Sequence, residues 1–249
     1  MTRLPAVALL LGVVFGAMAC NPYSREDLLF AMVAPSSDEL RVAPPGTEAA
    51  SNDDTEGTSQ TTQAMEAGCG PTNLRCHATD VARGFNHLTT SVLAIVDHVL
   101  GLPPTFRQSG DGYTRRVWGP TRVDNGATIR VEMVRTPDDL YVICMHGAAG
   151  ALDERPTPED FNCESDPADY GLTTLINGAF APGDIQGGRA QNGKGVILFH
   201  ADAFGAADPG LAALGKVHFY YDNTAQERFV GVNVSGSEAL AIDSDYLFF

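Results

Sequence analysis

Apolar residues recur at every third or fourth position after residue 80, which is the spacing of one face of an α-helix. Thr79 and Asp80 both suit the N-cap position, and Gly101 followed by Pro103-Pro104 ends the periodic segment. The apolar stripe covers about five helical turns. It consists of Val81, Phe85, Leu88, Val92, Ile95 and Val99. The pattern predicts one long helix that precedes the rest of the folded body.

Beyond Pro104 the period of the pattern changes to two, which predicts β-strands. Residues 127–135 alternate between an apolar side, predicted to be buried, and a side with Arg130 and Glu132 that is predicted to face solvent. A loop rich in proline and acidic residues is expected from residue 147 to about 170. Further strands are expected at residues 113–118, 140–146, 195–203, 216–221, 228–234 and 246–249.

Short turns such as Thr136-Pro137-Asp138-Asp139 join neighbouring strands, so the sheet should be antiparallel. We therefore predict an α+β fold, in which one long N-terminal helix packs on a curved antiparallel β-sheet. The sheet would be a meander or a half-barrel.

The first twenty residues have the pattern of an export signal. Arg3 precedes an apolar run, Leu4–Phe15, which is short for a transmembrane helix, and Gly16-Ala17-Met18-Ala19-Cys20 follows it. This segment resembles the lipobox of bacterial lipoproteins, in which the cysteine becomes the lipidated first residue of the mature chain. The usual pattern has leucine at the position of Ala17, and Ala17-Met18-Ala19 also resembles the cleavage site of an ordinary secreted protein. We favour lipidation of Cys20, since it leaves an even number of cysteines for disulfide bonds.

Composition then divides the chain into three parts. Residues 1–19 are predicted to be a signal peptide, and residues 20–68 a lipidated N-terminus with a disordered spacer that is rich in Pro, Ser, Thr, Gly, Asp and Glu. Within the spacer, Ser24 is expected to cap a short helix with Asp27 in its first turn. Residues 69–249 are predicted to form a single domain.

Four cysteines remain in the exported chain, which indicates two disulfide bonds. Three connectivities are possible, and we favour Cys69–Cys76 with Cys144–Cys163 because each closes a local loop. The spacing of the cysteines and histidines matches neither a haem attachment motif nor a zinc site. We therefore expect no metal and no other cofactor.

Acidic residues outnumber basic ones by 31 to 16, which gives a formal net charge of −15. Nucleic-acid binding would need clustered Lys and Arg and is not expected. The same net charge argues against binding an anionic bilayer through the protein surface. The predicted membrane partner is therefore reached through the N-terminal lipid anchor.

Two sets of residues are candidates for further chemistry. Five aromatic residues could line an apolar ligand cavity between helix and sheet, or could simply fill the core. They are Trp118, Phe199, Phe219, Tyr221 and Phe229. Histidines 146, 200 and 218 all fall on predicted strands and could meet in space as a catalytic or metal-binding trio, or could be ordinary sheet positions.

Three short motifs carry a second resemblance. They are Leu102-Pro103-Pro104-Thr105, Val117-Trp118-Gly119-Pro120 and Gly193-Lys194-Gly195-Val196. With them the body is similar to a loosely defined group of uncharacterised exported lipoproteins of Gram-negative bacteria, over about Asp80 to Val234. The resemblance implies a cell-envelope lipoprotein, which we place at the outer membrane, and it implies no activity.

The expected function is accordingly a non-enzymatic structural or interaction role at the cell envelope. A binding module for an apolar or lipid ligand is the first alternative, and the partner or ligand is unknown. A hydrolase with an unrecognised site is the second alternative.

Overall fold

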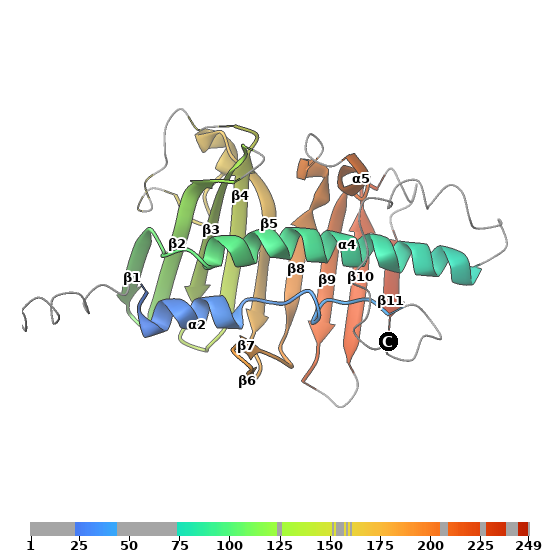
Figure 1. Ribbon diagram of the computed structural model, residues 1–249, viewed down its shortest axis with the longest axis horizontal. Helices are drawn as coiled ribbons and strands as arrows, with labels where there is room; N and C mark the ends of the chain where they lie inside the picture. The colour runs from blue at the N-terminus through green and yellow to red at the C-terminus, as the bar shows by residue number, and fades with distance from the viewer. Residues whose placement is uncertain are drawn as a thin grey trace, which may run out of the picture.

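The computed structural model describes residues 23–43, 74–123, 126–150, 152, 157, 159, 161–204, 209–224, 228–237 and 244–248. Two helices, α2 (Arg25–Val33) and α4 (Leu74–Leu100), lie on one face of a sheet of nine strands (Figure 1). Every pairing in this sheet is antiparallel, and the strand order is β1-β2-β3-β4-β5-β8-β9-β10-β11. The sheet is therefore an open meander with β1 and β11 at its edges.

The strands of the sheet are β1 (Phe106–Gly110), β2 (Tyr113–Arg122), β3 (Thr128–Arg135), β4 (Tyr141–Ala148), β5 (Thr173–Ala181), β8 (Lys194–His200), β9 (Lys216–Asp222), β10 (Phe229–Ser235) and β11 (Ser244–Phe248). A two-stranded ribbon, β6 (Ile185–Gln186) with β7 (Arg189–Ala190), is inserted between β5 and β8. Three short helical turns complete the described elements. They are η1 (Pro167–Tyr170), η2 (Ala201–Phe204) and α5 (Pro209–Ala212).

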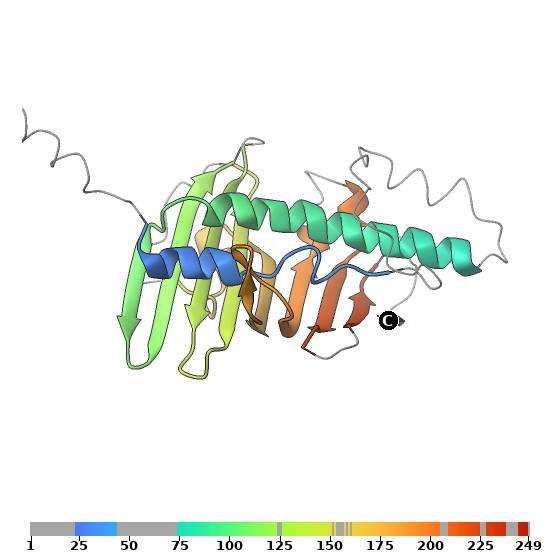
Figure 2. The same cartoon turned by 60° about the horizontal axis from the view of Figure 1, so that its bottom comes forward.

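The core lies between the two helices and the sheet. Helix α4 crosses most of the strands, and α2 runs beside it over the first strands (Figure 2). The predicted apolar stripe of α4 faces the sheet, and the ring of Phe85 packs edge-on against Phe219 of β9 at a centroid distance of 6.1 Å. Phe30 of α2 packs in the same way on Tyr141 of β4, at 5.5 Å. Burial of these aromatic side chains, together with that of the aliphatic residues around them, stabilises the packing of the helices on the sheet.

Helix α2 begins where its sequence predicts. The hydroxyl of Ser24 accepts a hydrogen bond from the backbone N–H of Asp27, and the Asp27 carboxylate accepts one from the backbone N–H of Ser24, which is a capping box. After α2 the chain continues along the sheet and buries Leu40 and Val42 completely. The side chain of Asn86 on α4 bonds both backbone groups of Val42, at 2.8 and 3.0 Å.

Residues 23–43 thus correct two predictions. The predicted spacer of residues 20–68 includes this segment, which instead packs on the sheet. Phe30, Leu40 and Val42 give the segment an apolar side, and the average composition of the segment conceals it. The prediction of one N-terminal helix is wrong as well, because α2 precedes α4 and shares its face of the sheet. The α+β class and the antiparallel sheet are confirmed, and the sheet is open.

Strand β5 was not expected from the sequence. It lies inside the sheet between β4 and β8, and its residues are too small and mixed to show an alternating pattern. Gly178 illustrates the reason, since a Cβ at this position would lie 2.4 Å from the carbonyl oxygen of Val196 on β8. The close approach of two backbones therefore selects the residue here.

The disulfide Cys144–Cys163 is confirmed, and it joins β4 to the segment that precedes η1. Cys76 on α4 is also disulfide-bonded. Its predicted partner, Cys69, lies outside the described residues, as does Cys20. None of the described helices combines the length and the apolar composition that a membrane crossing requires.

The packing of α2 predicts a specific effect on stability. Phe30 is fully buried, so Phe30→Ala should lower the free energy of unfolding by about 3–5 kcal/mol. Leu28 lies on the same helix with 46% of its surface exposed, and Leu28→Ala should change stability by no more than about 0.5 kcal/mol. Urea titration of both variants measures the difference. Equal effects would show that α2 does not contribute to the core.

Candidate functional site

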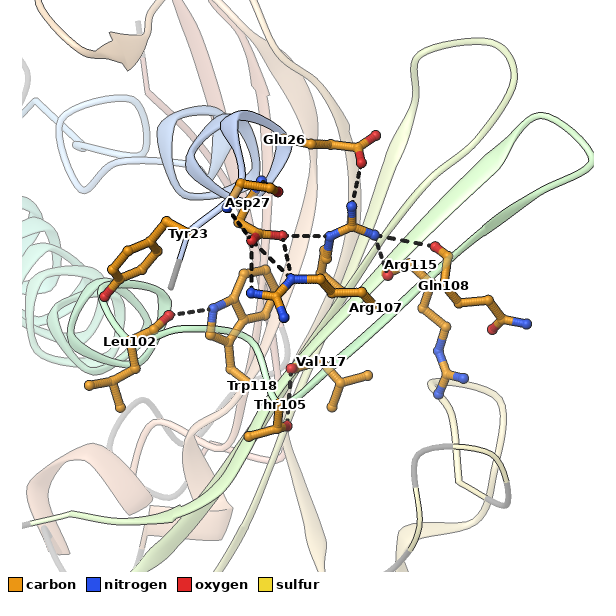
Figure 3. A network of polar contacts seen from close by, with 12 residues as sticks. Tyr23, Glu26, Asp27, Leu102, Thr105, Arg107, Gln108, Arg115, Val117 and Trp118 are labelled. Atoms are coloured by element: carbon orange, nitrogen blue, oxygen red, sulfur yellow. Dashed lines mark hydrogen bonds and ion pairs between the residues drawn. The ribbon is translucent and has the colours of Figure 1, made fainter. Parts of the chain in front are cut away.

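The most elaborate polar site joins the N-terminus of α2 to the edge of the sheet, and we call it the α2 clamp (Figure 3). Its centre is the carboxylate of Asp27, of which only 2% is exposed. Arg116 Nε donates to its Oδ1 at 2.8 Å, and Arg107 Nε donates to its Oδ2 at 3.0 Å. With the capping bond from Ser24, both carboxylate oxygens are engaged.

Arg116 has partners for its whole guanidinium group. Besides Asp27, it bonds the carboxylate of Glu26 and the backbone oxygens of Gln108 and Arg115. The guanidinium also lies over the ring of Phe30, at 5.6 Å from the centroid. Charge-assisted bonds of this kind are the strong ones in proteins, so α2 is fastened at its first turn.

The strand register explains why a carboxylate is needed here. Arg107 of β1 and Arg116 of β2 are directly opposite each other in the antiparallel pair, and like charges at such positions repel. Asp27 lies between them and neutralises the repulsion. Burial alone would raise the pKa of Asp27, but the bonds from Arg107, Ser24 and Arg116 outweigh it and lower this pKa well below its usual value.

The same corner also holds the C-terminal end of α4. The hydroxyl of Tyr23 donates to the carbonyl oxygen of Gly101, and the indole N–H of Trp118 donates to that of Leu102 at 2.9 Å. Carbonyl groups at a helix end lack partners within the helix, and these side chains supply them. The start of α2, the end of α4 and strands β1 and β2 are therefore bonded together.

A second polar cluster lies on the opposite face of the sheet. Arg115 binds the Glu132 carboxylate through two bonds, at 2.8 and 2.9 Å, and Arg130 binds it at 2.7 Å. Both guanidinium groups also donate to the backbone oxygen of Phe161, and that of Arg130 lies 4.5 Å from the Phe161 ring centroid. Together with Cys144–Cys163, this cluster holds the segment before η1 on the sheet.

This second cluster corrects the prediction that Arg130 and Glu132 face solvent. Each has 1% of its surface exposed, because the segment around Phe161 covers this face of β3. The sequence offered a signal in retrospect, since the two residues have opposite charges and stand two positions apart on one strand. It could not show which segment would cover them.

Two buried polar atoms in this region have no hydrogen-bond partner among the described residues. They are Nη1 of Arg130 and Nδ1 of His146, on directly opposite residues of β3 and β4. Burial, with a smaller effect from the charge of Arg130, lowers the pKa of His146 to about 4. His146 is therefore neutral at neutral pH and cannot repel the guanidinium.

An open pocket of about 390 Å³ lies at the end of the sheet where η1 and η2 meet β5 and β9. It is lined by Pro167, Ala168, Leu172, Thr173, Thr174, His200, Asp202, Ala203 and Lys216. His200 Nε2 is 2.9 Å from Oδ1 of Asn177, and burial, followed by the charge of Lys216, lowers the pKa of His200.

The predicted histidine trio is only partly brought together. His146 is buried under Phe161, His200 is at the pocket, and His218 stacks on Tyr220 of its own strand. Among the described residues, the only acidic, cysteine and histidine atoms close enough to hold an ion belong to Glu132, Cys144 and Cys163. Both sulfurs are in the disulfide, so this group serves the fold.

The aromatic set is divided between the two faces of the sheet. Four members are at most 4% exposed and fill the core, where Phe199 packs edge-on against Phe219 at 5.4 Å. These four are Trp118, Phe199, Phe219 and Tyr221. Phe229 neighbours Val230, whose buried side chain belongs to the core, so alternation puts Phe229 on the other face. Four of the five residues therefore pack in the core, and the set does not share one face of the sheet.

Comparison with known protein families, with curated proteins and with solved structures found no match. The described buried ionic groups of this chain fasten segments of it to the two faces of the sheet.

The α2 clamp predicts how stability depends on Asp27. Asp27→Asn leaves two guanidinium groups with a neutral partner and should lower the free energy of unfolding by about 3–5 kcal/mol at pH 7. Because the folded pKa lies below the ordinary 3.8, the contribution of the carboxylate is present above about pH 4 and is lost on further acidification. Denaturant titration at several pH values measures both effects.

The matched control is Asp139→Asn, which removes an exposed carboxylate that pairs with Arg135. It should cost no more than about 1 kcal/mol. A similar loss in both variants would contradict a special role for the clamp.

His146 predicts a separate pH dependence. Its pKa is about 4 in the folded chain and near 6.5 when unfolded, so protonation favours the unfolded state as the pH falls through this interval. Wild-type protein should lose up to about 3 kcal/mol between pH 6.5 and 4, and His146→Gln should lose less. His98→Gln, which changes an exposed residue of α4, should retain the wild-type profile in the same titration. Identical profiles for all three proteins would refute the assignment.

Proposed function

We propose that this protein is a lipoprotein of the bacterial cell envelope, tethered to the membrane through Cys20, with a non-enzymatic structural or interaction role. The observation that carries the proposal is the position of the α2 clamp. The leader and its cysteine end at residue 20, and the first described residue, Tyr23, already bonds the folded body. A strong attachment so close to the anchor suits a protein that must resist detachment of its N-terminus.

Two further features support the proposal. The disulfide between Cys144 and Cys163 is typical of an oxidising compartment such as the periplasm or the cell surface. The two ionic clusters each hold a segment against one face of the sheet, and among their buried side-chain nitrogen and oxygen atoms only Nη1 of Arg130 lacks a hydrogen-bond partner within the described residues. Ionisable groups that are bonded in this way are better suited to stabilising the fold than to catalysis.

Lipidation is tested by following the protein in a Gram-negative host. The wild-type chain should enter the membrane fraction and incorporate labelled palmitate, because a thioether-linked diacylglycerol and an N-acyl chain together anchor stably. Cys20→Ala should incorporate no label and leave the membrane fraction. Asn21→Ala, which keeps the cysteine, serves as the matched control and should behave as wild type.

Wild-type protein recovered without acyl groups, with Cys20 as a free N-terminal residue, would contradict the proposal. That result would favour cleavage after Ala17-Met18-Ala19 as in an ordinary secreted protein. Separation of inner and outer membranes by density tests the expected outer-membrane location in the same experiment.

A further inference from the structure

The distance between the lipid anchor and the folded body is limited by the covalent chain. Three peptide units separate Cys20 from Tyr23, and even a fully extended backbone spans only about 11 Å over that length. The acidic, Ser- and Thr-rich stretch near residues 51–60 lies after α2 and not before it. It therefore connects two helices of the body and adds nothing to the reach of the anchor.

Helix α2 is held too firmly to lengthen the tether. Asp27 is bonded to two arginines and Phe30 is fully buried, so releasing α2 would break ion pairs and expose core side chains. The link between Cys20 and the folded body consequently ends at Tyr23. Its hydroxyl is bonded to Gly101 at the end of α4.

This attachment point lies at one end of the molecule. The start of α2, the end of α4 and edge strand β1 meet there, whereas the start of α4 and strands β9 to β11 lie at the other end (Figures 1 and 2). We call the first region the α2–β1 corner and define it as α2, β1 and β2. Arg25, Leu28 and most of β1 are exposed in it.

The charge of the α2–β1 corner differs from that of the whole chain. Residues 25–33 and 106–122 contain five arginines and three acidic residues, and Arg115 is neutralised by Glu132 of β3, which leaves a net charge of +1 in a chain of −15. In the neighbouring last turn of α4, Asp97 is paired with Arg189 of β7. The total charge argues against contact with an anionic surface, but this local charge favours it.

We propose that the α2–β1 corner rests directly against the headgroup layer of the membrane, held there by the short link to acylated Cys20 and favoured by anionic lipid. The opposite end of the sheet, with β9 to β11, then lies away from the bilayer. This inference depends on the proposed lipidation of Cys20 and adds to it an orientation and a contacting surface.

The test compares a near and a far position on the lipidated full-length protein in vesicles. A genetically encoded fluorescent amino acid replaces either Gln108, exposed on β1, or Arg83, whose side chain is 71% exposed near the start of α4. The vesicles contain phosphatidylcholine with a nitroxide on the headgroup, with or without phosphatidylglycerol. Quenching at position 108 should be several-fold stronger than at position 83.

Two variants distinguish the effect of the short link from the effect of the local charge. A flexible insertion of about 20 Gly and Ser residues between Asn21 and Pro22 adds roughly 25 Å of reach and should equalise the two positions in phosphatidylcholine. Arg25→Glu should weaken the difference only in vesicles that contain phosphatidylglycerol. Arg83→Glu in the protein labelled at position 108 makes the same charge change at the far end and should have no effect.

Equal quenching of the two positions in lipidated wild-type protein would overturn the orientation. An insertion without effect in phosphatidylcholine would overturn the role of the short link, and an Arg25→Glu variant without effect would overturn the role of charge. Failure of lipidation itself is a different result, because fractionation and palmitate labelling detect it before any vesicle is prepared.

Discussion

An open antiparallel sheet exposes two faces, and each must be covered wherever its side chains cannot face water. On one face of this protein the side chains are apolar, and α4, α2 and the segment that follows α2 cover them. Over β2 to β4 the other face carries Arg115, Arg130 and Glu132, and the segment around Phe161 covers it. The main stabilising interaction differs between the two faces: burial of apolar area dominates on the first, and buried ion pairs hold the covering segment on the second.

The α2 clamp combines both kinds of interaction. Phe30 contributes buried area, and Asp27 contributes a carboxylate between two arginines that would repel each other without it. A buried charge without a partner destabilises the folded state. Removing either the carboxylate or the two guanidinium groups would leave the opposite charge buried and unpaired. The clamp therefore makes α2 an integral part of the body although it lies within the segment that the sequence predicted to be a spacer.

This arrangement changes how the N-terminal third of the chain is understood. A polar, Pro-rich stretch between a leader and a domain is usually interpreted as a spacer. Here folded residues 23–43 precede the acidic, Ser- and Thr-rich stretch, so with the proposed lipidation of Cys20 this stretch would not lengthen the anchor. Under the proposed lipidation, one end of the molecule would face the bilayer and the rest of the sheet would remain accessible.

The sequence by itself determined the elements whose signals are local. The apolar stripe of α4, the cap at Ser24, the alternating strands and the disulfide Cys144–Cys163 all depend on residues near one another in the chain. Only the tertiary structure decided which segments cover which face. Asp27 lies 80 residues or more from Arg107 and Arg116, and Phe161 lies 31 from Arg130, so no local pattern could pair them. The same long-range covering buried Arg130 and Glu132 on a side that alternation assigned to solvent, because burial is decided by what packs above a strand and not by the strand itself.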